Sequence, residues 1–234
     1  MPEHIPDVEM TALFNLPPDR IIEYLKDRGY IITQDWQAML ERSRERAFTI
    51  IGVMKDDIVA DAQKIVDTAI QEGKTFAAIK TEFKAAMQAK GWEASTYRLK
   101  TIYRVNMDVA YSVGRYQEQM AVADFAPYWQ YIAIMDSNTR PAHAEMHGKV
   151  FKADDPIWDY WYPPNGLNCR CTVRSYTEKK LERKGLKVES SKGKLKETMV
   201  EVQGKRIKTH SYNGVKIDPG WDYNPGKDFM RSKK

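Results

Sequence analysis

The residues best suited to chemistry lie in one segment, Asp136–Cys171, which holds both cysteines and two of the four histidines of the chain. His143 and His147 are four residues apart, so a helical turn would place them on one face. Cys169 and Cys171 are two residues apart, so an extended segment would also place both side chains on one face. Structural zinc sites use four nitrogen or sulfur ligands. The spacing therefore indicates a zinc site built from these two histidines and two cysteines.

Two other interpretations stay open. The Cys-x-Cys spacing is tighter than the usual spacing of zinc ligands, and it does not suit an unstrained disulfide. We therefore also consider the cysteines as small, reduced core residues, with Asp136 and Thr139 capping a turn before Pro141. The neighbouring polar side chains would then form a hydrogen-bonded network; they are Arg140, His143 and Arg170.

A catalytic interpretation is a metal-dependent nuclease that uses Asp136, His143 and His147. Hydrolysis at a metal needs an open coordination position and a general base, and Glu145 is the one evident candidate for that base. We therefore expect no enzymatic activity, and we keep a nuclease, or the delivery module of a toxin, as the alternative.

The charge is unevenly distributed. The 234-residue chain has a net charge of +5, but the residues after Cys171 contain 17 Lys and Arg against 8 Asp and Glu. A basic tail of this kind suits a polyanion, and we predict non-specific contact with double-stranded DNA. The predicted DNA-binding residues are Lys179, Lys180, Arg183, Lys184, Lys192, Lys194, Lys196, Lys205, Arg206 and Lys208. A solvated basic surface is the alternative, and no apolar run or amino-terminal signal indicates a membrane partner.

The elements that must position these residues are predicted from periodicity. Apolar residues at helical spacing predict five helices, at about 19–28, 35–51, 56–71, 75–90 and 95–123. Tyr111 and Tyr116 on the longest helix are expected at the surface, as contacts for a partner.

From Pro127 the pattern changes to short β-branched and aromatic runs. Strands are predicted at 128–135, 149–151 and 172–176, a short helix at 177–184, and a hairpin from 199–202 and 207–209. Lys192–Lys196 is expected to be flexible, and 219–226 to form a turn-rich arm. The fold class is α+β. The chain is expected to divide into a helical region (1–126), a β-containing module (127–185) and a basic tail (186–234). Removing the chain from Lys192 onward should leave the rest of the protein folded.

The segment Asp136–Cys171 also carries a combination of motifs. In sequence letters it follows the pattern D-x-x-T-R-P-x-H-x-x-x-x-G-x-x-F, then a spacer with Trp158 and Trp161, then P-P-x-G-x-N-C-R-C. The matching residues are Asp136, Thr139, Arg140, Pro141, His143, Gly148, Phe151, Pro163, Pro164, Gly166, Asn168, Cys169, Arg170 and Cys171. This combination resembles the phage Mu protein F-like head morphogenesis family, and similar stretches extend over most of the chain.

The resemblance implies a minor head protein of a tailed phage or prophage, made in the host cytoplasm and located in the virion head. Its implied partners are the portal and the major capsid or scaffold proteins, and its role would be procapsid assembly near the portal. Some family members carry Cys at the positions of Arg140 and His143 and His at the position of Gly166, which gives a fuller zinc set. In this chain the resemblance leaves His143, Cys169 and Cys171, with His147 or Asp136 as the fourth ligand, so the cofactor is either zinc or none.

Overall fold

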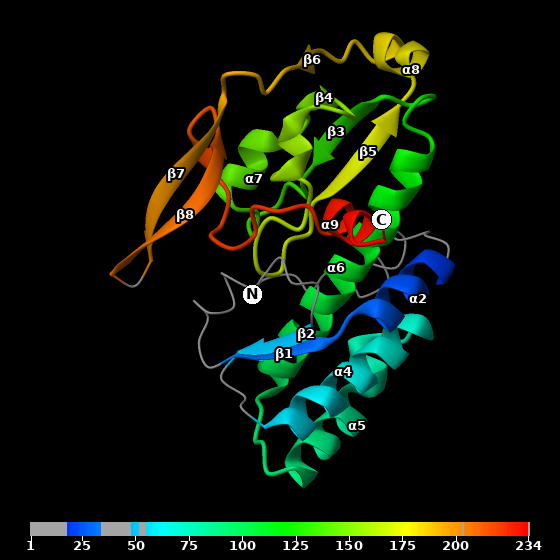
Figure 1. Cartoon of the computed structure of the whole chain (residues 1–234), viewed down its shortest axis with the longest axis vertical. Helices are drawn as coiled ribbons and strands as arrows, with labels where there is room; N and C mark the ends of the chain where they lie inside the picture. Colours follow the sequence, from blue (N-terminus) through cyan, green and yellow to red (C-terminus); the bar gives the residue numbers. More distant parts are fainter. Residues whose placement is uncertain (1–17, 34–47, 52–54, 203, 234) are drawn as a thin grey trace.

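The computed structural model describes residues 18–33, 48–51, 55–202 and 204–233. The helical half contains α2 (Pro18–Asp27), β1 (Tyr30–Thr33), β2 (Phe48–Ile51), α4 (Asp56–Gln71), α5 (Phe76–Ala89) and α6 (Thr96–Ala121). The other half contains β3 (Tyr128–Ile132), α7 (Pro141–Met146), β4 (Val150–Lys152), the 3-10 helix η1 (Pro156–Asp159), β5 (Thr172–Tyr176), α8 (Glu178–Arg183), β6 (Val188–Glu189), β7 (Leu195–Val202), β8 (Lys205–Tyr212), β9 (Val215–Lys216) and α9 (Pro225–Arg231). This arrangement confirms the α+β class (Figure 1).

The helical half follows the predicted periodicity except at its first strands. Helices α4, α5 and α6 match the predicted helices. At the start of α5 the Thr75 hydroxyl accepts a hydrogen bond from the Ala78 amide, and at the start of α6 the Ser95 hydroxyl accepts one from the Arg98 amide. The predicted helix over 35–51 is wrong at its end, because Phe48–Ile51 pairs in parallel with Tyr30–Thr33. Both segments are rich in β-branched and aromatic residues, which favour strands. The rest of that predicted helix, 35–47, lies outside the described residues.

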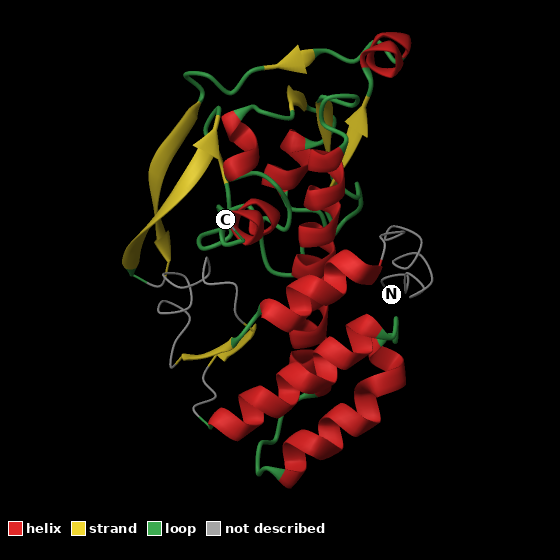
Figure 2. Cartoon of the chain, turned by 45° about the vertical axis from the view of Figure 1, so that its right-hand side comes forward, coloured by secondary structure: helices red, strands yellow, loops and turns green. Residues whose placement is uncertain are grey.

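The β-module is centred on a four-stranded sheet with the order β5-β3-β4-β6. β3 lies between β4 and β5 and is antiparallel to both, whereas β6 is parallel to β4. A second sheet has the order β7-β8-β9, and its long hairpin stands away from the rest of the module in both views (Figures 1 and 2). The predicted hairpin is confirmed, but it begins earlier than expected. Lys196 lies within β7, and Ser191 is buried against Asp155, so this segment is not a flexible linker.

Helix α6 joins the two halves because each end packs in a different core. Its first part, from Leu99 to Val113, packs with α2, α4 and α5. Further along, Tyr116 packs edge-on against Trp129 and Tyr162 in the aromatic core of the β-module, at 5.8 and 5.1 Å between ring centroids. Tyr116 is therefore buried rather than a surface contact, and Tyr111 is partly buried against the helical core. The expectation that both are exposed is wrong, because the β-module and Gly226 cover Tyr116 and the helical core covers part of Tyr111.

The carboxy-terminal segment closes over α6. Asn224 accepts a hydrogen bond from the Lys227 amide at the start of α9 and donates one to the Trp158 carbonyl at 2.8 Å. Gly226 lies so close to the Tyr116 ring that a Cβ atom there would be 2.3 Å from the Cβ of Tyr116. Phe229 is 1% exposed and belongs to the helical core. The tail therefore contributes to the core of the distant helical half, and removing Lys192–Lys234 would expose that core.

No helix within the described part of the chain has the length and apolar character needed to cross a membrane.

Candidate metal centre

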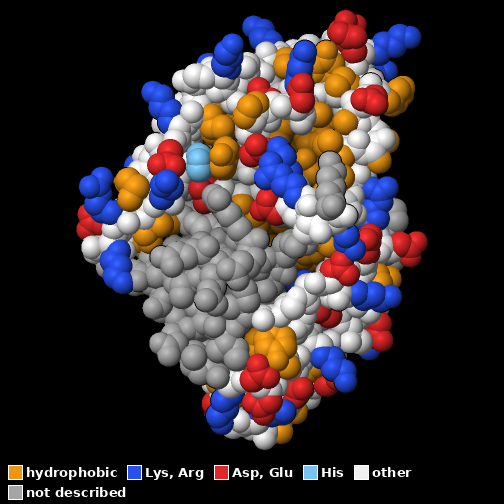
Figure 3. Space-filling view, in the orientation of Figure 1, with side chains coloured by type: hydrophobic (Ala, Val, Ile, Leu, Met, Phe, Trp, Pro, Cys, Tyr) orange, Lys and Arg blue, Asp and Glu red, His pale blue; other side chains and the backbone are white. Residues whose placement is uncertain are grey.

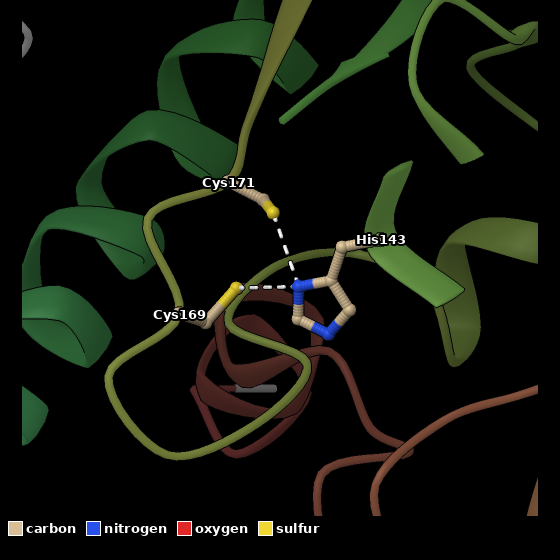
Figure 4. A group of neighbouring side chains, drawn as sticks. All are labelled: His143, Cys169 and Cys171. Carbon is tan, nitrogen blue, oxygen red and sulfur yellow. Dashed lines mark hydrogen bonds between the residues drawn. The ribbon is translucent and has the colours of Figure 1, made fainter. Parts of the chain in front are cut away.

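Three of the predicted ligands come together between α7 and the segment that leads into β5. Helix α7 starts with Pro141 at its first position and places His143 in the interior, 3% exposed. Figure 4 shows one ring nitrogen of His143 facing both cysteine sulfurs. This atom, Nδ1, lies 3.7 Å from Sγ of Cys169 and 3.3 Å from Sγ of Cys171. The three potential donor atoms all lie within 4.8 Å of one another.

The two thiols differ in acidity. Burial raises the pKa of Cys169 well above its usual range. Hydrogen bonding with the Cys169 thiol lowers the pKa of Cys171, and burial opposes this change. Hydrogen bonding with Tyr131 and the positive charges of Arg140 and Arg170 lower the pKa of Cys171 further. Cys171 is thus the thiol that ionises more readily, and a cation would have to displace the proton of the deeper Cys169.

The geometry of this group fits a tetrahedral cation. Zinc bonds to sulfur and nitrogen of ordinary length hold those atoms about 3.6 Å apart in a tetrahedron, close to the observed spacing. Among the described residues, the buried Nε2 atom of His143 has no hydrogen-bond partner. His143, Cys169 and Cys171 would hold the cation, which would cross-link α7 to the β5 segment. Among the described residues, no fourth His, Cys, Asp or Glu atom joins the three within the same radius.

His147 is not brought to this group. Helix α7 ends at Met146, and His147 has an extended backbone, so the i to i+4 relation expected from a continuous helix is lost. The side chain is exposed, and its Nδ1 accepts a hydrogen bond from the Ala133 amide at 3.0 Å. The two-histidine, two-cysteine arrangement predicted from spacing is therefore not formed here.

Asp136 is likewise engaged elsewhere. Its two carboxylate oxygens accept hydrogen bonds from Arg170 at 2.6 Å each, and this interaction lowers the pKa of Asp136. It also accepts hydrogen bonds from the Asn138 amide and from the Thr139 hydroxyl, which closes the turn before Pro141. The Asp136, His143 and His147 trio of the nuclease interpretation is not assembled, because these side chains point to different partners.

Several motif residues have structural roles around the centre. Gly148 and Asn168 have positive φ values of 84° and 57°, a conformation that glycine and asparagine tolerate best. A Cβ at Gly166 would be 2.3 Å from the Asp218 carboxylate, so a side chain there would have to displace Asp218. Asp218 in turn pairs with Arg140, whose guanidinium also donates to the Leu167 carbonyl at 2.7 Å. Sequence reasoning missed Asp218, since nothing in the local pattern connects it with a segment 50 residues earlier.

The ten predicted DNA-binding cations are all exposed, on α8, on the loop before β7 and on the hairpin. Figure 3 shows Lys and Arg side chains around the upper and left outline, over these elements. The strand register divides the hairpin cations between two faces. Arg206 and Lys208 share one face with Glu201 and Glu197, and Lys208 pairs with Glu197 at 2.8 Å. Lys196 and Lys205 lie on the other face, which has no acidic side chain.

The region that matches known proteins includes the segment Asp136–Cys171. Residues 60–174 match the protein family described as Phage Mu protein F like protein. The chain is 36% identical to capsid assembly protein F of Escherichia phage Mu in an alignment of 254 positions that covers 97% of this chain and 57% of that protein. It is 34% identical to the Mu-like prophage FluMu F protein of Haemophilus influenzae in an alignment of 219 positions that covers 83% of this chain and 53% of that protein.

The chain therefore belongs to the phage Mu protein F-like family, as the motif Asp136–Cys171 indicated. It spans a little over half the length of the curated relatives that it matches. No solved structure matches the chain.

Proposed function

We propose that this protein is a head-assembly component of a Mu-like phage or prophage and acts without catalysis. The observation that carries the proposal is the similarity over nearly the whole chain to a protein named for capsid assembly. The site agrees with a structural role, because the motif residues build a turn, an ion-pair network and a three-donor cluster rather than an open catalytic group. The proposed location is the virion head, after assembly in the host cytoplasm.

We further propose that the protein contacts the portal and the capsid or scaffold proteins through apolar side chains left exposed by the fold. Phe125, just after α6, is 76% exposed, with Met120 and Val122 also exposed nearby in sequence. Exposed aromatic residues are common at the centres of protein interfaces. Phe125 thus replaces Tyr116 as the candidate contact at the carboxy-terminal end of α6.

The assembly proposal predicts that the protein sediments with procapsids or mature heads. Mass spectrometry of gradient-purified particles should detect its peptides, and Phe125→Ala should reduce their amount while the purified variant stays fully folded. Thr81→Ala, an exposed change on α5, should leave incorporation unchanged. Absence of the protein from both kinds of particle, while it is abundant in the lysate, would contradict the proposal.

We propose that DNA contact, where it occurs, uses α8 and the cationic hairpin face. Lys179 and Arg183 lie on α8 and Lys184 directly follows it; together with Lys180 they outnumber the acidic residues Glu178 and Glu182 of the helix. Mobile point charges suit phosphates better than base edges, so binding should be independent of sequence.

This contact should show a strong dependence on salt. If about five phosphates are neutralised, the logarithm of the binding constant should fall with the logarithm of salt with a slope of about −4 to −5. Replacing Lys179, Arg183 and Lys184 by Gln should flatten the slope by about one unit per lost phosphate contact. The matched control replaces three exposed lysines of α4 and α5, Lys64, Lys80 and Lys84, by Gln. An equal effect of both triple variants would place DNA contact elsewhere, and no binding at low salt would refute it.

A further inference from the structure

A carboxylate from the helical half faces the candidate metal centre. Asp108 of α6 lines a small cavity of about 30 Å³ together with Cys169 and Cys171. Ser112, one turn further along α6, also lines this cavity, and its hydroxyl donates a hydrogen bond to the Pro163 carbonyl. Helix α6 is thereby held against the loop that carries the cysteines, and Asp108 lines the same cavity as Cys169 and Cys171.

Asp108 lacks the partners that such a position normally requires. Among the described residues, no hydrogen bond or ion pair to its carboxylate is found, although the charge of Arg104, one turn earlier, acts on it. Burial, and then the charge of a Cys169 thiolate, raise the pKa of Asp108 well above its usual range, whereas Arg104 lowers it. A poorly solvated carboxylate beside two thiols is costly unless a cation is present.

The cavity has the size that a bridging contact would need. A cavity of about 10–15 Å³ is large enough to hold one water molecule. His143, Cys169 and Cys171 supply three ligands, whereas zinc takes four. Cys169, Cys171 and Asp108 line the same cavity, so a fourth group could reach the cation from this side of the cysteines.

We propose that Asp108 belongs to the metal centre and supplies the fourth polar group facing a divalent cation held by His143, Cys169 and Cys171. The carboxylate acts across the cavity, directly or through a bridging water, and ties α6 to the β-module when the cation binds. The inference rests on the proposed centre and extends it to the helical half of the chain.

Zinc affinity of the purified full chain tests this assignment. In competition with a chromogenic chelator, Asp108→Asn should bind zinc about 10- to 100-fold more weakly than the wild type, the usual effect of removing a supporting group. The absorption spectrum of the cobalt-substituted protein should also change, because the surroundings of the cation differ. Asp124→Asn, an exposed change just after the same helix, should alter neither measurement.

Unfolding of the metal-free protein separates this role from a purely structural one. Without metal, Asp108→Asn should be as stable as the wild type or more stable, since it removes a poorly solvated charge. With zinc, it should gain less stability than the wild type. Asp108→Ala is a second variant. It should also be at least as stable as the wild type without metal and should gain less stability from zinc.

Two results would overturn the proposal. Equal zinc affinity and equal cobalt spectra of the wild type and Asp108→Asn would remove Asp108 from the centre and leave the three-donor site intact. Loss of stability in the metal-free variant, equal to its loss with metal, would make Asp108 structural. A wild type that binds neither zinc nor cobalt would refute the centre and this inference together, without bearing on incorporation into particles.

Discussion

Phe229→Ala is expected to destabilise the protein by about 3–5 kcal/mol, the usual cost of truncating a fully buried Phe. Phe229 is 1% exposed and packs edge-on against Tyr24 at 5.4 Å, although the two residues lie at opposite ends of the chain. The truncation would leave a cavity where α9 meets the helical core. Urea unfolding of the purified variant, followed by circular dichroism, measures the change.

Phe125→Ala is the matched control, because the same side chain is removed from a position that is 76% exposed. Its free energy of unfolding should stay within about 0.5 kcal/mol of the wild type, as is usual for surface substitutions. If Phe229→Ala is equally harmless, α9 does not dock on α6 in solution, and the carboxy-terminal segment behaves as the free tail expected from the sequence.

Zinc is expected to stabilise the wild type by about 2.7 kcal/mol when its free concentration is 100 times the dissociation constant. The effect follows because the cation binds the folded arrangement of His143, Cys169 and Cys171 and not the unfolded chain. Addition of EDTA should reverse it. Cys169→Ser should unfold at the same urea concentration with zinc and with EDTA, since one of the three donors is lost.

Comparing unfolding in zinc with unfolding in EDTA separates the effect of the metal from the effect of side-chain packing on stability. Cys169 is 4% exposed, so the serine variant loses some stability in any case. The decisive quantity is the difference between zinc and EDTA for each protein. A wild type with no such difference, or a Cys169→Ser variant with the full difference, would contradict the metal interpretation.

The helices with strong local signals could be predicted from the sequence. The bounds of α4 and the capping residues of α5 and α6 follow from apolar spacing and from Thr75 and Ser95. The pairing of Tyr30–Thr33 with Phe48–Ile51 could not, because parallel strands depend on contacts across intervening residues. The β-branched run itself was the available signal, and it was outweighed by helical spacing in the residues before it.

Burial by distant segments explains the other differences. Tyr116 looks like a surface residue in the α6 sequence, but Trp129, Tyr162 and Gly226 cover it in the folded chain. In the predicted arm, Trp221 packs against the core of the β-module. What the sequence did not show is that the same arm continues into a helix that reaches the other core.

The candidate site was predictable where its residues are close in sequence. His143, Cys169 and Cys171 meet as their spacing suggested, whereas His147 does not, because the helix ends one residue before it. Asp108 lies 61 residues before Cys169, and Asp218 lies 52 residues after Gly166, so only the fold reveals them. The division into three domains remains a prediction, and the shared helix α6 now gives a reason to test it.

The most direct test of the metal centre is the zinc content of three proteins purified without added metal: the wild type, His143→Ala and His147→Ala. The structure places His143 among the donors, whereas His147 binds the Ala133 amide instead. We therefore predict about one equivalent of zinc in the wild type and in His147→Ala, and less than about a tenth in His143→Ala, since zinc needs its nitrogen ligand. Less than a tenth of an equivalent in the wild type, or an equal loss in both histidine variants, would contradict the account.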